Sequence, residues 1–345
     1  MMLAELGADV VRVDRPNGTE LTAGDELVDL TNRGKRSITL DLKTPGGVST
    51  VLKLAAKSDV LIEGSRPGVA ERIGVGPDAC FAANPRLVYG RMTGWGQNGP
   101  LADRAGHDID YIALSGALDA IGVSGGPPVL PLNLVGDFGG GANYMVIGVL
   151  AALLEARTSG SGQIVDAAII DGAIHLMTVV HMLSAAGRWT YERGQNLLDG
   201  GTPYYSVYRT KDNRFMAVGA IEPRFYRLML EGLGLDLDPL AQNNSVTWPA
   251  TREVIERTFA TRTRAEWTAV FDGVDACVSP VLSTREAAQD PHILARGSLV
   301  ERDGVLQSAP APRFSRTITS LTSPPAIPGA DSAMILADWG SECAN

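Results

Sequence analysis

Cysteine is scarce in this chain, and its few occurrences are unpaired. The 345 residues include three cysteines, Cys80, Cys277 and Cys343, which lie far apart and form no C-x-x-C motif. An odd number of widely spaced cysteines argues against a disulfide framework and offers no cysteine metal site. We therefore expect a protein of the reducing cytoplasm that holds no metal.

A surplus of positive charge is also absent. Lys and Arg total 30 residues against 39 Asp and Glu, which gives a formal net charge of −9. Because the nucleic-acid backbone requires a basic face, this balance argues against a nucleic-acid partner. A small anionic ligand would need only a local cluster of cations, so the net charge does not exclude one.

The sequence has no continuous apolar run of membrane-spanning length. Its most apolar stretch, Tyr144–Leu154, ends at Glu155, whereas a spanning helix needs about 20 apolar residues. Glu5 and Asp9 interrupt the start of the chain, which does not resemble a signal peptide. We therefore expect no membrane partner and a cytoplasmic location.

Two common enzyme signatures are missing as well. No G-x-G-x-x-G follows the first predicted strand, and H-E-x-x-H does not occur. The first absence argues against a nicotinamide dehydrogenase, and the second argues against a zinc protease.

What the sequence does contain, up to about residue 185, is an alternation of strands and helices. Apolar and β-branched runs predict strands over Val10–Val13, Ser37–Leu42, Val60–Glu63, Leu87–Arg91 and Gln163–Ile169. Helical segments are predicted over Gly46–Lys57, Gly68–Ile73, Pro77–Asn84, Ile109–Ile121, Gly141–Arg157 and Asp171–Ala185. This order predicts an α/β fold with a doubly wound parallel sheet.

The pattern changes after residue 190, so we expect three parts. Residues 1–190 form the large domain, and residues 200–295 form a smaller α+β domain that begins with a hairpin, Tyr204–Arg209 and Arg214–Gly219. Helices follow around residues 224–232, 251–260 and 264–271. Residues 296–345 are rich in proline, end in a short helix near Ser332–Trp339, and are expected to return to the large domain.

Two glycine-bounded motifs point to chemistry. Ala105–Tyr111 contains His107, and Leu134–Gly141 contains Asp137, each at the start of a predicted helix. A neutral imidazole and a carboxylate on either side of a carbon acid can move a proton from one face to the other. The pair predicts an isomerase that acts beside an activated carbonyl. Asp137 could instead be a helix N-cap, and His107 could be an ordinary loop residue.

Other charged residues have both a structural and a functional interpretation. Basic residues gather at or near strand ends, where they either form a solvated face or bind phosphate: Arg12, Arg15, Arg33, Lys35, Arg36, Lys43 and Arg66. Glu222 follows the second hairpin strand and precedes Pro223, which suits a residue that caps the next helix.

Several motifs in order resemble the racemases of CoA-transferase family III. They are the two motifs above together with Asp9–Pro16, Arg33–Ser37, Leu40–Lys43, Arg91–Gln97, Asn196–Gly201, Gly219–Pro223 and Asp275–Val281. The resemblance runs through nearly the whole chain. It implies a Rossmann-like large domain, a small α+β domain and an interlocked homodimer with each active site at a subunit boundary.

The resemblance also implies roles for individual residues. His107 and Asp137 would each take the α-proton from one enantiomer of a 2-methylacyl-CoA, with an enolate between them, and Glu222 from the partner's small domain would support the histidine. No metal or bound cofactor would be needed, because CoA enters as part of the substrate. The residues implied in binding the CoA thioester are Arg15, Leu40, Asp41, Leu42, Lys43, Arg66, Arg91, Gly106, Asp108, Ile109, Asp110 and Tyr111.

Two alternatives stay open at this point. In transferases of the family an aspartate near position 137 is a nucleophile that forms an acyl anhydride, a role that needs no opposed base. An inactive CoA-binding protein is the second alternative, because the family has a further strand and a Gly/Pro loop before the residue that matches Met1. Loss of a central strand would expose sheet edges, so we expect the true start to lie upstream. Asp110 stands where the family commonly has Asn.

Overall fold

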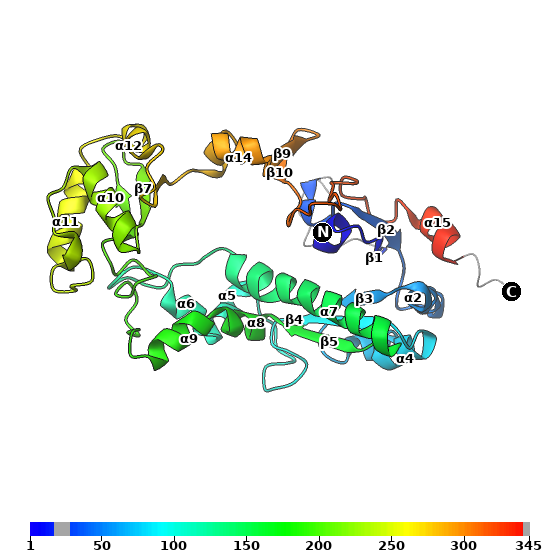
Figure 1. Cartoon of the computed structure of the whole chain (residues 1–345). Helices are drawn as coiled ribbons and strands as arrows, with labels where there is room; N and C mark the ends of the chain where they lie inside the picture. The colour runs from blue at the N-terminus through cyan, green and yellow to red at the C-terminus, as the bar shows by residue number, and fades with distance from the viewer. Residues whose placement is uncertain (17–27, 341–345) are drawn as a thin grey trace. The chain divides into compact units, whose positions relative to one another are not determined.

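The computed structural model describes residues 1–16 and 28–340, and Cys343 lies outside them. The chain forms two compact units, each described here by itself (Figure 1). Unit 1 comprises Met1–Tyr111, Asn133–Ala173 and Ala288–Asn345, and unit 2 comprises Ile112–Leu132 and Ile174–Ala287. The predicted boundary between the domains lies between residues 190 and 200. The two compact units do not divide there, because residues 112–132 and the segment from residue 174 onward already belong to unit 2.

Unit 1 is built on parallel strands, as the alternation of elements predicts. Strands β1 (Val10–Asp14) and β2 (Lys35–Thr39) form one parallel pair, with Val10 opposite Lys35. Strands β3 (Val60–Glu63), β4 (Val88–Thr93) and β5 (Ile164–Ala168) form a second parallel sheet with β4 in the middle. All five predicted strands are present, but among the described residues they form two sheets instead of one.

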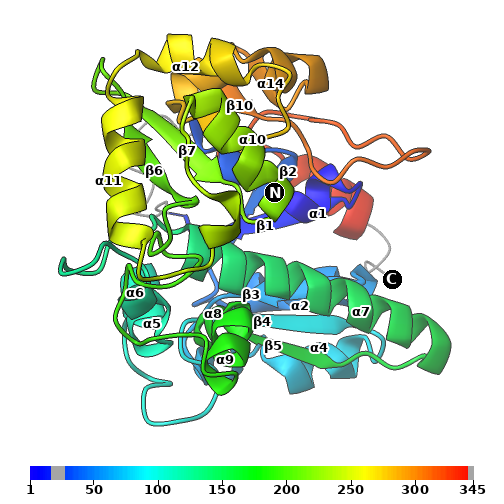
Figure 2. The same ribbon diagram turned by 60° about the vertical axis from the view of Figure 1, so that its left-hand side comes forward.

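Helices cover both faces of the β3–β4–β5 sheet, which confirms the doubly wound α/β class (Figure 2). Val88 of β4 is buried with Met145 and Val149 of helix α7 (Asn143–Ser159) on one face. Its neighbours Leu87 and Tyr89 pack on the other face against helices α2 (Pro45–Lys57) and α4 (Pro77–Ala83). Alternate side chains of one strand therefore supply two hydrophobic layers.

The remaining elements of unit 1 are short or lie in the C-terminal segment. They are α1 (Met2–Glu5), the 3₁₀ turn Leu30–Asn32, α3 (Val69–Ile73), the first residues of α5 (Asp108–Leu114) and of α8 (Ile169–Leu176), α14 (Pro291–Arg296), β9 (Leu299–Arg302), β10 (Val305–Ser308), α15 (Ser332–Ile335) and the π-type turn Leu336–Gly340. The β9–β10 hairpin was not predicted. The segment after it packs on the first strands, because Ile335 is buried beside Ile38 and Leu54.

A buried ion pair ties the start of unit 1 to this hairpin. The Arg33 guanidinium lies 2.6 Å from Glu5 Oε1, and both side chains are almost completely buried. Arg33 Nη1 also donates to Gln307 Oε1 of β10 at 3.1 Å. The basic residue therefore supports packing here and does not face a ligand.

Unit 2 is an α+β unit whose core is aromatic. Strands β6 (Tyr205–Arg209), β7 (Phe215–Gly219) and β8 (Val278–Pro280) form an antiparallel sheet, of which the β6–β7 hairpin was predicted. Phe259 stacks on Tyr208 with centroids 5.3 Å apart. The other elements are α6 (Ala117–Ala120), α9 (Thr178–Ala185), α10 (Pro223–Leu233), the turn Pro239–Ala241, α11 (Trp248–Phe259), α12 (Arg264–Phe271) and α13 (Thr284–Ala287).

Two predicted helices are interrupted, and one begins earlier than expected. Predicted helix Ile109–Ile121 is divided into α5 and α6 at Gly116, whose φ of +82° cannot continue a helix. Predicted helix Asp171–Ala185 is likewise divided into α8 and α9.

A π-helix, η3 (Leu134–Ala142), comes directly before α7. Together they form one helix, Leu134–Ser159, which is long and apolar enough to cross a membrane by length and composition. The core helices of other proteins also meet this criterion.

Candidate functional site

Tight packing under the histidine motif fixes its backbone. The Tyr111 hydroxyl donates to the Gly106 carbonyl, and the Tyr111 ring meets Trp95 edge to face at a centroid distance of 4.8 Å. A Cβ on Gly106 would lie 2.7 Å from the Tyr111 ring, so only glycine fits there. Asp110 accepts the backbone N–H of His107 at 2.9 Å in the first turn of α5. The His107 side chain is left exposed in this fixed loop.

Asp137 lies inside the π-helix η3 and is not an N-cap. The cap position belongs to Asn133, whose carbonyl accepts the Phe138 N–H at 3.2 Å. Its bonds to residues five positions back make this helix wider than an α-helix, a rare geometry that often marks functional sites. The capping interpretation of Asp137 is therefore wrong, and its carboxylate is available for another role.

Burial and three neighbouring groups act on the Asp137 carboxyl. Partial burial raises its pKa above the usual aspartate value, and the negative charge of Asp108 raises it further. A hydrogen bond from the Asn133 side chain and the charge of His107 act in the opposite direction, but the net pKa shift is upward. A carboxylate made more basic in this way is a better proton acceptor at neutral pH.

The structure brings the two predicted catalytic residues together within unit 1. His107 is near enough to Asp137 for its charge to lower the pKa of that carboxyl. Glu222 belongs to unit 2, where it occupies the N-cap position of α10 with Pro223 in the first turn, but its side chain makes no capping hydrogen bond. Its expected role beside His107 stays a prediction.

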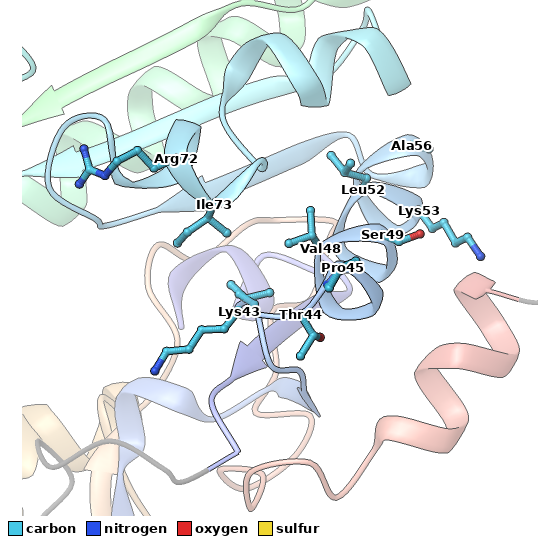
Figure 3. A pocket seen from close by; sticks show the side chains of 11 residues that line it. Lys43, Thr44, Pro45, Val48, Ser49, Leu52, Lys53, Ala56, Arg72 and Ile73 are labelled. Carbon is cyan, nitrogen blue, oxygen red and sulfur yellow. The ribbon is translucent and has the colours of Figure 1, made fainter.

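A cavity of about 770 Å³ lies at the start of α2 (Figure 3). Apolar walls come from Val48, Leu52 and Ile73; Lys43 and Arg72 also line the cavity, and their charged ends extend outward from α2. Apolar walls suit a flat base, and cations suit phosphate groups. Two of the residues that the resemblance implied, Leu42 and Lys43, line this cavity, whereas Arg72 was not predicted.

Arg91 has a structural environment that differs from its predicted role. Its side chain is buried and forms ion pairs with Glu63, at 3.3 Å, and with Glu71. The arginine in turn lowers the pKa of Glu71. The guanidinium is paired with two carboxylates in this structure, and the expected contact of Arg91 with CoA stays a prediction.

The other predicted binding residues lie outside the lining of the cavity. Arg15 and Arg66 are exposed, and Leu40 packs beside buried Ile38 and Val51. Asp41 is used locally, because its carboxylate accepts the Lys43 N–H at 3.0 Å. The remaining residues belong to the histidine motif and the start of α5: Gly106, Asp108, Ile109, Asp110 and Tyr111.

Part of the predicted basic cluster is neutralised by neighbouring carboxylates. Arg12 pairs with Asp14 at 2.7 Å, and Arg36 pairs with both Asp9 and Asp338. These pairs support the solvated-face interpretation for that part of the cluster. Within residues 1–16 and 28–340, no group of three or more His, Cys, Asp or Glu side chains is placed to hold a metal ion.

One further segment matches a catalytic pattern by sequence alone. Gly122–Gly126 fits G-x-S-x-G, the motif that carries the nucleophile of many serine hydrolases. That chemistry requires a sharp turn from a strand into a helix. Here the segment is a turn closed by a bridge from Gly122 to Pro128, and no helix follows it directly. The local structure therefore argues against a serine nucleophile.

Comparison with known proteins shows the family of the chain. Residues 1–342 match the model of CoA-transferase family III. The chain is 45% identical to "Alpha-methylacyl-CoA racemase" of Mus musculus over 96% of its length and 84% of the mouse protein, and 44% identical to the Homo sapiens protein of that name over 99% and 88%. The crystal structure of a CAIB/BAIF family protein from Brucella suis matches with a TM-score of 0.84 at 26% identity, over 98% of this chain and 93% of that one.

Proposed function

The chain belongs to CoA-transferase family III, and from this premise we propose that it is an isomerase that racemises 2-methylacyl-CoA thioesters. The observation that carries the proposal is the placement of His107 and Asp137 in one compact unit, where Asp108, the residue after His107, accepts the Asp137 N–H. Identity of 44–45% to two racemases over nearly the whole chain supports the same reaction.

The chemistry follows from the two side chains. A thioester stabilises a carbanion at its α-carbon as an enolate, so a base of ordinary strength can remove the α-proton. His107 takes the proton from one enantiomer while protonated Asp137 delivers a proton to the opposite face. The reverse reaction exchanges these roles. One proton is shared between the two residues, and the net reaction inverts the stereocentre without consuming any other reactant.

In this proposal, the cavity at the start of α2 binds the nucleotide part of CoA. Lys43 and Arg72 would pair with phosphate groups, and the apolar walls would take the adenine ring. No resident cofactor is required by this scheme, since CoA arrives and leaves as part of the thioester. An anchored nucleotide would leave the acyl chain free to change position as the stereocentre inverts.

A second copy of the chain is part of the proposal. Helix α7 exposes Ile147, Leu150 and Leu154, which are 62%, 40% and 66% accessible. An apolar helix face of this kind is a site for a partner, and the homodimer implied by the resemblance would cover it. Sedimentation equilibrium tests this point: we expect a dimer that Leu154→Glu weakens, and a monomeric wild-type protein would contradict it.

A CoA-transferase that uses Asp137 as a nucleophile is less well supported. Such an enzyme needs no base opposite the aspartate, yet His107 is held in a fixed loop beside it.

Solvent deuterium exchange tests the reaction. The protein is incubated with (2R)-2-methyldecanoyl-CoA, and separately with its (2S) enantiomer, in deuterated buffer, and NMR follows the α-proton and the configuration. We expect exchange with inversion in the wild type. His107→Ala and Asp137→Asn should each stop inversion, and each should retain exchange for only one of the two enantiomers. Exchange without inversion in the wild type, or no exchange at all, would reject the racemase.

A further inference from the structure

Asp108 and Asp137 belong to different helices but share a hydrogen bond. Asp108 is the first residue of α5, and its Oδ2 accepts the backbone N–H of Asp137 at 2.7 Å. Asp137 lies in the first turn of η3. The hydrogen bond that opens this helix comes from the next residue, because the Phe138 N–H donates to the Asn133 carbonyl. The Asp137 N–H therefore has no acceptor along its own helix, and Asp108 supplies one.

Gly136 provides the space for this contact. A Cβ at position 136 would lie 2.8 Å from the Asp108 Cγ, with the carboxylate oxygens around it. Gly136 is buried, and its backbone does not adopt the left-handed conformation that favours glycine. Glycine is therefore needed at this position because the Asp108 carboxylate occupies the place of a side chain.

The same carboxylate acts on the Asp137 side chain through its charge. The groups that act on that side chain are Asp108, His107 and the Asn133 amide, and Tyr111 is coupled to it as well. Among these, Asp108 is the negative charge that raises the pKa of Asp137, in addition to burial. Asp110, in the same turn of α5, binds the His107 N–H instead.

We propose that Asp108 is a positioning residue for proton transfer: it holds the backbone of Asp137 in place and sets a negative charge beside the Asp137 side chain. The inference rests on the proposed function. It assigns to Asp108 a task different from the CoA contact that the resemblance implied, because the carboxylate is directed at Asp137 and not at the cavity of α2.

Asp108→Asn separates the two effects. The amide oxygen can still accept the Asp137 N–H, but the negative charge is gone, so the acid limb of the pH profile of kcat/KM should move to lower pH. Asp108→Ala removes both effects, and kcat should fall about 100-fold, the loss expected for a displaced catalytic group. An acid limb that stays in place in Asp108→Asn would overturn the proposal.

Gly136→Ala gives an independent test that leaves Asp108 in the chain. The added methyl group meets the end of a flexible side chain, so we expect a folded protein whose Asp108 carboxylate has left the Asp137 N–H. Its kcat should fall as in Asp108→Ala while its melting temperature stays close to that of the wild type. Wild-type kcat in folded Gly136→Ala would contradict the positioning role.

A direct titration gives a readout that needs no turnover. Carbon-13 NMR of Asp-labelled protein, with the Asp137 signal assigned from Asp137→Asn, measures the pKa of Asp137 itself. We expect a lower pKa in Asp108→Asn and an unchanged one in the matched control Asp110→Asn. Equal pKa values in the wild type and Asp108→Asn would reject the inference. A shifted pKa in a protein without α-proton exchange would reject only the racemase function.

Discussion

Gly140 of the π-helix and Gly172 of α8 cross in backbone-to-backbone contact. A Cβ on Gly172 would lie 2.6 Å from the carbonyl carbon of Gly140, and a Cβ on Gly140 would lie 2.6 Å from the Ala173 nitrogen. Both obstacles are backbone atoms, which cannot turn aside as a side chain can. The crossing fixes the helix that carries Asp137 against the helix that follows β5.

Gly172→Ala should therefore be destabilising. The methyl group must push two backbones apart, and overpacking of this kind typically costs about 1–3 kcal/mol. Urea denaturation measures the loss. Gly46→Ala is the matched control, because that glycine lies in α2 with nothing within 4 Å of an added Cβ, and alanine favours a helix. Equal stability of the two variants would show that the helices separate at no cost.

The buried pair of Arg33 and Glu5 predicts a second large effect. Arg33→Ala leaves the Glu5 carboxylate buried without its cation, which should lower the free energy of unfolding by about 3–5 kcal/mol. Arg257→Ala serves as the control, since its pair with Glu253 is about two-thirds exposed and should contribute about 0.2–1 kcal/mol. Comparable losses in the two variants would contradict the burial argument.

Arg72→Ala should weaken substrate binding and leave the chemical step intact. Loss of a charge-assisted hydrogen bond of about 1.5–3 kcal/mol corresponds to a rise in KM of roughly 10- to 100-fold. The value of kcat should change little, because His107 and Asp137 are untouched. Arg86→Ala removes an exposed arginine that does not line the cavity, and it should leave KM unchanged. A fall in kcat alone for Arg72→Ala would assign the residue another role.

The Glu286 carboxylate gives a pH-dependent prediction for unit 2. Ion pairing with Arg264 and hydrogen bonds from Ser283 lower its pKa from 4.5 to about 2. Because the pKa is lower in the folded state, the stabilisation is complete above pH 4.5 and is lost as the pH falls toward 2. The difference in melting temperature between wild type and Arg264→Ala should therefore narrow between pH 5 and pH 2. A difference independent of pH would show that the ion pair does not stabilise the unit.

Local sequence patterns predict much of this fold because they act over a few residues. The alternating strands and helices of unit 1 come from short apolar periods, and the β6–β7 hairpin comes from Thr210–Asn213 between two β-rich runs. The placement of His107 beside Asp137 was predicted from the two motifs together with the resemblance, because neither local segment specifies the other.

Features that depend on distant partners could not be predicted in this way. The environment of Gly136 is set by Asp108, which lies 28 residues earlier in the sequence. The local sequence of residues 134–141 does not distinguish a π-helix from a capped loop. The ion pairs of Arg91 with Glu63 and Glu71 likewise join residues that lie 28 and 20 positions apart in the sequence. Arg72 was overlooked because it sits in an ordinary short helix.

The contact between Arg33 and Gln307 also has a consequence for the order in which the chain is made. The two residues are separated by 274 positions, so the surroundings of the first strands do not exist when those strands leave the ribosome. At a synthesis rate of about 5–20 residues per second, the interval is roughly 14–55 s. Until then Gln307 cannot contact Arg33, so the N-terminal layer is completed only after most of unit 2 has been translated.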